Sequence, residues 1–261
     1  MQCYQITICN AKTKMGKNIL APYTSENIHP GFSVDCVILS FHKNKIRVLL
    51  YKFNLEDYWA IPGGFMLKHE NADEAAYRIL KSRIGLTNIY LKQFHLFSDP
   101  KRTIMKQNKD FVKKNAATPK DGEWLLQRFI SMGYYALVKY EEVDLTHDKE
   151  ENYKWYDIHQ LPHMYSDHEN IVATAMETIR TMLPVIPIGY ELLPEKFTMS
   201  ELRKIYEIIL GKTLDRRNFQ RKVLSDGRII QLEERISNKT YNPPILYSFS
   251  LSEGDSPELF I

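Results

Sequence analysis

From position 32 onward, the chain alternates between short apolar runs and segments with an apolar stripe. FSVDCVILSF (32–41) and KIRVLLYKF (45–53) are rich in β-branched residues and are separated by a polar, turn-like stretch, a pattern that predicts a β-hairpin. A glycine turn at Pro62-Gly63-Gly64 leads into ADEAAYRILKSRIGL (72–86), where apolar residues recur at helical spacing until Gly85. We therefore expect strand, turn and helix in this order.

Three later runs of β-branched and aromatic residues are typical of strands: NIYLKQFHLF (88–97), RFISMGYYALVKY (128–140) and KWYDIHQLP (154–162). The second is long and aromatic enough to be a central strand, and the third runs into a turn. DHENIVATAMETIRTML (167–183) has helical periodicity, with Asp167 as a candidate N-cap. This alternation predicts a mixed α/β domain over 31–183, preceded by a polar arm over 1–30.

The pattern of apolar and polar residues changes after residue 183. Residues 184–196 hold three prolines and no sustained period, so we expect a linker there. FTMSELRKIYEIILG (197–211) is an amphipathic helix candidate, LDRRNFQRKVLSDGRII (214–230) contains a second, and two strand-like pieces follow. Helix, turn, helix and hairpin predict a small winged helix-turn-helix domain over 197–250, with an acidic tail over 251–261.

Composition excludes a membrane-spanning protein and is typical of a globular one. The chain has 261 residues, of which 44% are hydrophobic and 26% charged, and no run approaches the roughly 20 apolar residues of a membrane span. The start of the chain shows no secretory signal. Its three cysteines, Cys3, Cys9 and Cys36, are odd in number, which favours a reduced compartment. We expect the protein in the cytoplasm.

Net charge is only +3, but the basic residues are concentrated in two places. Residues 101–120 carry seven Lys and Arg against one Asp, and residues 196–240 carry eleven against six acids. Such runs raise the question of nucleic acid, although a charged run is more often a solvated face. The stretch 101–120 could contact DNA, cover a ligand pocket or be disordered, and we favour a mobile loop.

The segment GGFMLKHENADEAAYRILKSRIGL (63–86) resembles the Nudix box. The matching residues are Gly64, Glu70, Arg78, Leu80, Gly85 and Leu86. Six matches in a loop-to-helix context form a specific pattern. The resemblance implies an α/β fold, the Nudix α/β/α sandwich, over residues 31–183.

The chain departs from the box where a hydrolase holds its metal. Ile79, Ser82 and Arg83 replace the three glutamates of the box helix. These positions are spaced i, i+3 and i+4, so carboxylates there could converge on one Mg²⁺, whereas an isoleucine, a serine and a guanidinium cannot hold it. Glu70 and Glu74 could be substitute ligands, but we favour solvent-facing acids on the first helical turn. We expect no metal, no cofactor and no catalysis.

The second helix of the C-terminal unit has a face suited to DNA. Its predicted DNA-binding residues are Arg216, Arg217, Asn218, Arg221, Lys222 and Ser225, with Lys239 at the tip of the hairpin. Phe219 and Val223 point the other way, toward a core. Arginine can recognise guanine and asparagine can recognise adenine in the major groove. The same pattern also suits a helix whose exterior is merely solvated.

The C-terminal unit as a whole resembles the winged-helix domain of the Nudix-related transcriptional regulators. The matching pieces are Phe197-Thr198, Glu201-Leu202, Tyr206-Glu207, Leu214 to Phe219 and Leu246 to Phe249. The resemblance implies a homodimer that binds a palindromic operator in double-stranded DNA. It also implies a small-molecule effector in a catalytically degenerate Nudix domain, either an ADP-ribose-like nucleotide or a sugar.

The predicted effector-binding residues are Trp59, Phe65, Glu70, Arg78 and Arg83. The two aromatic residues bracket the glycine turn and could stack on an adenine or a sugar, or could be core or rim residues. A metal site at His159, His163 and His168 is disfavoured because Pro162 prevents a regular helix turn. The alternatives to a regulator are a Nudix pyrophosphatase with an accessory C-terminal domain and a generic binding protein.

Overall fold

The computed structural model describes residues 23–53, 55, 57–87, 89, 91–116, 118–143, 145, 152–183, 192–225, 227–235 and 244–250. The acidic tail, Lys239 at the predicted wing tip and most of both the arm and the linker lie outside these residues. No helix in these ranges has the length and apolar character needed to cross a membrane.

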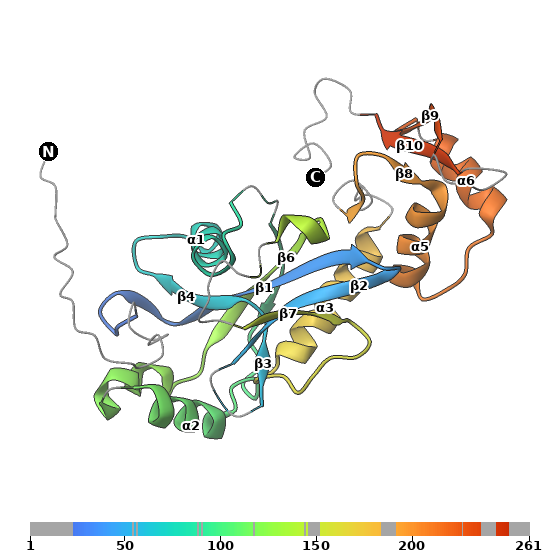
Figure 1. Cartoon of the computed structure of the whole chain (residues 1–261). Coiled ribbons are helices and arrows are strands. Elements are labelled where there is room, and N and C mark those ends of the chain that lie inside the picture. The colour runs from blue at the N-terminus through green and yellow to red at the C-terminus, as the bar shows by residue number, and fades with distance from the viewer. Residues whose placement is uncertain are drawn as a thin grey trace, which may run out of the picture.

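The first domain is a mixed seven-stranded sheet with helices on both faces (Figure 1). Its elements are β1 (Ile28–His42), β2 (Lys45–Lys52), β3 (Trp59–Ala60), β4 (Gly63–Leu67), α1 (Ala72–Ile84), β5 (Lys92–Phe97), α2 (Met105–Asn115), the 3₁₀ helices at Pro119–Leu125 and Tyr140–Glu142, β6 (Ile130–Leu137), β7 (Tyr153–Asp157) and α3 (His168–Met182). The strands run in the order β3-β2-β1-β6-β5, with β4 also pairing with β1 and β7 with β2. The predicted α/β sandwich is confirmed.

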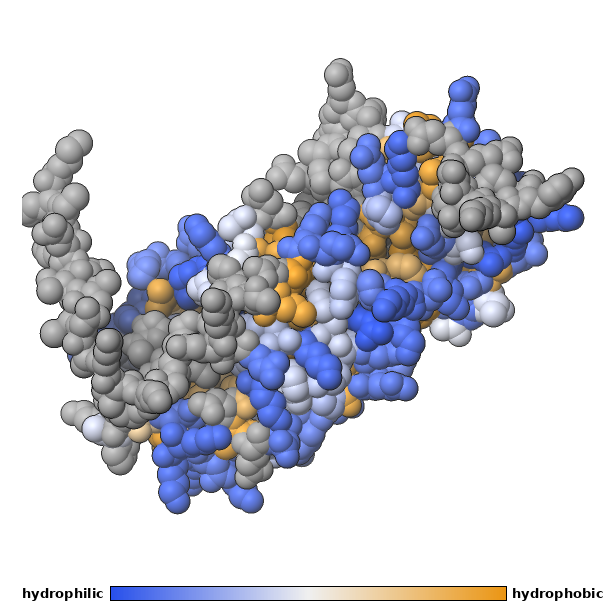
Figure 2. Space-filling model, viewed as in Figure 1, coloured by the Kyte–Doolittle hydropathy of each residue, from blue (hydrophilic) through white to orange (hydrophobic). Residues whose placement is uncertain are grey.

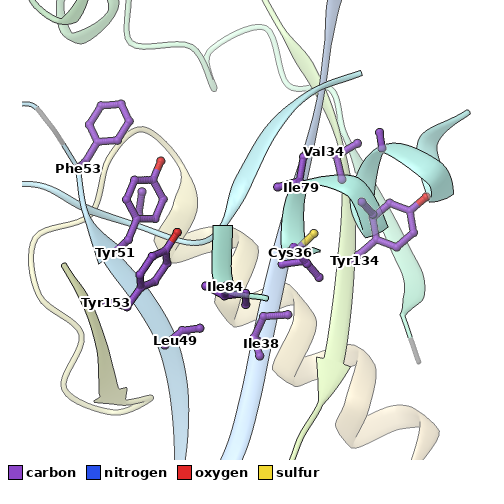
Figure 3. Close-up of a cluster of buried hydrophobic side chains, with 14 of the residues drawn as sticks. Val34, Cys36, Ile38, Leu49, Tyr51, Phe53, Ile79, Ile84, Tyr134 and Tyr153 are labelled. Atoms are coloured by element: carbon purple, nitrogen blue, oxygen red, sulfur yellow. The ribbon is translucent and has the colours of Figure 1, made fainter. Parts of the chain in front are cut away.

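The central strand β1 shows how the sequence pattern builds the two layers. It pairs with β2 through a tight turn in which Lys43 and Asn44 both have positive φ, the geometry of the predicted hairpin. Along β1, Val34, Cys36 and Ile38 belong to the core under α1 (Figure 3), whereas Val37 and Leu39 belong to the core under α3. Because both faces are covered, this strand is nearly continuously apolar.

Helix α1 covers the predicted periodic segment and ends before Gly85, whereas Gly63 and Gly64 of the predicted glycine turn are the first two residues of strand β4. Asn71 and Glu74 form a reciprocal capping box at its start, and Gly85 closes it with a φ of 69°. Ile79 and Ile84 pack into the core beside β1 (Figure 3). The chain therefore holds the box helix in a fixed position at the edge of the cavity described below.

The prediction of a mobile loop over 101–120 is wrong for the part of that stretch described. Residues Met105–Asn115 form α2, which buries Phe111 and Val112 against the core of the first domain. Asn108 Nδ2 donates a hydrogen bond to the Leu125 carbonyl, and the side chain of Gln107 accepts one from the Ser166 backbone. A few apolar and amide side chains among many lysines therefore anchor the segment.

The second domain is a winged helix, as predicted. It contains β8 (Phe197–Thr198), α5 (Met199–Leu210), α6 (Arg216–Ser225), β9 (Ile229–Arg235) and β10 (Ile245–Phe249). The two later strands form the expected antiparallel hairpin, and the short strand β8, which was not predicted, completes a sheet in the order β8-β10-β9. Thr198 and Glu201 form a capping box at the start of α5.

The two domains are in direct contact along α5. This helix packs against α3 and β2, and one hydrophobic cluster runs from the α3 face of the sheet into the winged helix. At the end of the contact, Arg180 Nε of α3 donates a 2.7 Å hydrogen bond to the Ile209 carbonyl in the last turn of α5. Helix α3 thus reaches from the sheet of the first domain to the first helix of the second domain.

The described ends of the arm and of the linker belong to the folded core. Ile28, inside the range assigned to the arm, starts β1 and pairs with Leu67 of β4. Tyr23 is also buried, and its ring packs edge-on against Phe65 at a centroid distance of 5.1 Å. Within the predicted linker, Leu192 and Leu193 are buried in the cluster that joins the domains.

Candidate effector cavity and nucleic-acid interface

The first candidate site is a cavity of about 110 Å³ in the first domain. It lies among β1, the start of β4, α2 and the start of α3. Its aromatic lining comprises Tyr23, Tyr51, Phe53, Phe65, Phe111, Phe129 and Tyr165. A mostly apolar cavity with a few polar groups at defined places is the usual form of a small-molecule site.

One part of the lining is a buried polar cluster built from distant segments. The Arg102 guanidinium makes a bidentate pair with Asp167, with both nitrogen–oxygen distances at 2.9 Å, and donates a further bond to the Phe129 carbonyl. Its Nη2 also lies 3.6 Å from Asp35 Oδ2, which accepts a 2.6 Å bond from Ser131. The cluster joins β1, β6, α3 and the segment before α2.

His168 completes this cluster at the first residue of α3. Its Nδ1 accepts a hydrogen bond from the Ile61 backbone nitrogen at 3.2 Å, and its Nε2 lies 3.7 Å from Asp35 Oδ1. Burial lowers the pKa of His168 below its usual value, even though the carboxylates of Asp35 and Asp167 act in the opposite direction. The imidazole is therefore neutral near pH 7, with its proton on Nε2, facing Asp35.

The aromatic part of the lining is formed by side chains from β2, α2 and the loop before α3. Phe53 stacks on Phe111 at a centroid distance of 4.8 Å and lies 4.2 Å from the Tyr165 ring. The Arg83 guanidinium lies over the Tyr51 ring, 5.1 Å from its centroid, which is a cation–π contact. These planar groups offer surfaces on which a base or a sugar ring could pack.

The three substituted box positions do not form a metal site. Ile79 is 1% exposed and packs in the core, where its Cδ1 lies 3.0 Å from the place a Cβ on Gly64 would occupy. The Ser82 hydroxyl donates to the Ile79 carbonyl of its own helix, and Arg83 lines the cavity. A hydrophobic side chain, a hydroxyl bound to the backbone and a cation do not suit Mg²⁺, which requires anionic or neutral oxygen ligands.

Glu70 and Arg78, both conforming to the box pattern, bind each other rather than the cavity. Glu70 accepts hydrogen bonds from Arg78 Nη2 at 2.6 Å and from the Leu67 backbone, and Arg78 also donates to the Phe65 carbonyl. Burial raises the pKa of Glu70, but the bonds from Arg78 and Leu67 lower it more, so it lies below its usual value. With 7% of its side chain exposed, Glu70 is not the solvent-facing acid that we favoured.

The remaining predicted effector residues divide between the cavity and its surroundings. Phe65 and Arg83 line the cavity, whereas Trp59, Glu70 and Arg78 do not. The Trp59 ring packs edge-on against Tyr156 at 4.9 Å, among residues on the α3 side of the sheet. Trp59 therefore has the structural role that was left open beside the stacking role.

Sequence reasoning missed Asp35, Arg102 and His168. The signal for Asp35 was present, because an acidic residue interrupts the apolar run FSVDCVILSF. Arg102 lies among the lysines of the basic stretch, and nothing in the sequence distinguishes it from them. His168 was considered only as part of a metal site with His159 and His163. His159 is exposed and His163 packs on Tyr58, and no cluster of metal-ligating side chains occurs in the described ranges.

The second candidate site is the outer face of α6. Asp215 caps this helix by accepting a 2.8 Å bond from the Asn218 backbone, and the helix is held from below by Phe219, whose ring packs edge-on against Tyr206. The described residues predicted to bind DNA are all exposed: Arg216, Arg217, Asn218, Arg221, Lys222 and Ser225. Figure 2 shows mostly hydrophilic residues where the surface at this end of the molecule is described. Asn218 and Arg221 hydrogen-bond to each other at 3.0 Å.

Comparison with known families agrees with both halves of the structure. A NUDIX domain family matches residues 29–175, more than half of the chain, and the NrtR DNA-binding winged helix domain matches residues 189–249. This is a Nudix-family protein with an NrtR-type winged helix. The two-domain architecture predicted from the separate motifs is confirmed.

Individual relatives of this Nudix protein match it over most of both chains. It is 26% identical over 245 residues to the ADPR responsive transcriptional repressor NtrR of Acinetobacter baylyi, covering 90% of this chain and 89% of the relative. The crystal structure of Shewanella oneidensis NrtR complexed with a 27mer DNA matches with a TM-score of 0.64 at 21% identity, covering 84% of this chain and 93% of that one. A MutT/nudix family protein from Enterococcus faecalis matches with a TM-score of 0.61 at 20% identity, covering 85% and 89%. The structural matches establish the fold.

Proposed function

We infer that this Nudix-family protein is a DNA-binding transcriptional regulator that senses a small effector. The observation that carries the proposal is the pairing of an exposed basic face on α6 with a Nudix cavity that lacks the metal-binding carboxylates of the box. The match to a DNA-binding winged helix family and the relative named as a transcriptional repressor both support it.

DNA recognition is assigned to α6. Arg217, Asn218 and Arg221 would face the bases, while Arg216 and Lys222 on the flanks would hold phosphates. We propose a homodimer, because a palindromic operator presents two identical half-sites about 34 Å apart, which two copies related by a two-fold axis would match. A cytoplasmic location, expected from the cysteine content, remains a prediction.

The effector is proposed to be an ADP-ribose-like nucleotide or a sugar, held in the cavity between the start of β4 and α2. ADP-ribose is the first candidate because the relative from Acinetobacter baylyi is named for its response to ADPR. Helix α3 would carry the signal, since it begins at His168 in the cavity and contacts α5 through Arg180. An effector that favours a different position of α3 would change the presentation of α6.

A DNA-binding titration tests the assignment of α6. Labelled DNA from upstream of the neighbouring genes is titrated with the full chain at several salt concentrations. Arg217→Ala should weaken specific binding by roughly 1 to 3 kcal/mol if the side chain contacts a base. The control is Lys81→Ala, which removes the same charge from an exposed site on α1. If the two variants weaken binding equally, α6 is not the recognition helix.

We propose that the cavity binds its ligand without hydrolysing it. Arg83 places a cation where a hydrolase needs a metal-binding carboxylate, and Ile79 is buried in the core. A pyrophosphatase assay with ADP-ribose and Mg²⁺ or Mn²⁺ should show no turnover by the full chain. Turnover above about 1 per second, the low end for ordinary enzymes, would favour the alternative of a Nudix hydrolase with an accessory domain.

A further inference from the structure

The cavity contains a donor and an acceptor set apart by a distance that a direct hydrogen bond cannot span. Asp35 Oδ1 and His168 Nε2 are 3.7 Å apart, and their side chains are 8% and 10% exposed. In the ranges described, the hydrogen bonds of this pair go elsewhere: Asp35 accepts through Oδ2 from Ser131, and His168 accepts through Nδ1 from Ile61. Both residues line the cavity, so Oδ1 and the Nε2 hydrogen remain available to a group that enters between them.

A hydroxyl group matches this pair. An oxygen placed about 2.8 Å from both atoms could accept from the His168 Nε2–H and donate its own hydrogen to Asp35 Oδ1. A phosphate oxygen could accept but has no hydrogen to donate, and an apolar group could do neither. The orientation is also fixed, because the bond from the Ile61 backbone to Nδ1 holds the imidazole with its hydrogen on Nε2.

The charge of the cluster favours a neutral group over an anionic one. Asp35 and Asp167 contribute two carboxylates, Arg102 contributes one guanidinium, and burial lowers the pKa of His168 so that it is uncharged near pH 7. The net charge of this end of the cavity is therefore negative. A phosphoryl group there would be repelled, so the anionic part of a ligand would lie elsewhere, with Arg83 as the other guanidinium of the lining.

The size of the cavity restricts which part of a ligand enters. Its volume of about 110 Å³ is below the roughly 300 Å³ usual for a whole drug-sized ligand. It suits a single ring, and Phe53, Phe111 and Tyr165 provide aromatic surfaces beside the polar pair. The remainder of a nucleotide would extend outward from the opening.

We propose that Asp35 and His168 form a hydroxyl-recognising subsite that accepts a sugar ring, so that the effector is a sugar or a nucleotide with an unsubstituted terminal sugar. This inference rests on the proposed effector function and specifies the ligand chemistry of the same cavity. Gly63 belongs to the subsite, because a Cβ at that position would lie 2.5 Å from Asp35 Oδ1 and displace the carboxylate.

Calorimetric titration of the full chain with ADP-ribose and with ADP tests the subsite, because ADP lacks the terminal ribose. The wild-type protein should bind ADP-ribose at least about tenfold more tightly than ADP. His168→Asn keeps an acceptor for the Ile61 nitrogen but removes the Nε2 donor, and Asp35→Asn replaces the carboxylate. Either variant should bring the ratio of the two affinities within about threefold of one, whereas Ser40→Ala, at a buried position of β1 outside the lining, should not change it.

Parallel titrations with D-ribose and L-arabinose distinguish a nucleotide-linked sugar from a free one. If only a free pentose binds, the same two variants should abolish that binding, and the effector is a free sugar. The inference is overturned if the wild-type protein binds ADP-ribose and ADP equally, if both variants keep the wild-type ratio, or if neither kind of sugar binds. In each of those cases a separate DNA titration decides whether the regulator function stands. Because a ratio is measured, a general loss of stability in one variant does not imitate the expected result.

Discussion

Replacing Arg102 by methionine should strongly destabilise the Nudix domain. The side chain is 7% exposed, and its removal would delete the bidentate pair with Asp167 and the bond to the Phe129 carbonyl. It would also leave Asp35, 8% exposed, without its cationic neighbour. Removing one partner of a buried ion pair typically costs about 3 to 5 kcal/mol, since the remaining charge stays desolvated. Asp167 is 17% exposed and can gain some hydration, so we expect a value near the lower limit.

Urea denaturation followed by tryptophan fluorescence measures this cost in the correct domain. The three tryptophans, Trp59, Trp124 and Trp155, all belong to the Nudix half of the chain. Lys101→Met is the matched control, because it makes the same substitution at the preceding, exposed position. A loss of less than about 1 kcal/mol for Arg102→Met, or an equal loss for both variants, would refute the conclusion that this residue organises the cluster beside the cavity.

Three further predictions concern pH, coupling and salt. Burial lowers the pKa of His168 in the folded state, so the unfolded state binds more protons below about pH 6.5. The wild-type protein should therefore lose more stability than His168→Asn as pH falls from 7 to 5, by at most about 1.4 kcal/mol per pH unit. Equal losses of stability in urea titrations of the two proteins would contradict this prediction. Arg180→Ala removes the bond to the Ile209 carbonyl, so in a DNA titration it should alter the response to effector more than the DNA affinity itself; an unchanged response would exclude this contact as a route of coupling. Lys222→Ala should make the plot of log affinity against log salt less steep by about 0.9 per protomer, a change that Lys81→Ala should not produce.

The general architecture was predictable because the turn and capping residues predict the same elements as the periodicity of the apolar positions. The hairpin turn at Lys43 and Asn44, the glycine end of α1 and the capping box of α5 each follow from residues within a few positions of one another. The exposed face of α6 followed from helical periodicity and from the burial of Phe219 alone. Such features need no knowledge of the tertiary contacts.

The cavity was less predictable because its polar residues come from distant segments. Asp35 and Arg102 are separated by β2, β3, β4, α1 and β5, and only the folded sheet brings them to 3.6 Å. The prediction of a mobile loop over the basic stretch was wrong for the same reason. Charged residues dominate its composition, but contacts of Phe111 and of the Asn108 amide with other segments fix its position. Likewise, the box pattern identified Glu70 and Arg78 without indicating that they bind each other.

The most direct test of the account follows DNA and nucleotide in one sample. ADP-ribose is titrated into the complex of the full chain with its operator fragment, while fluorescence anisotropy reports DNA binding and chromatography reports the nucleotide. We expect the DNA affinity to change with ADP-ribose concentration and the nucleotide to be recovered intact. DNA binding that no sugar or nucleotide alters, together with steady cleavage of ADP-ribose, would contradict it.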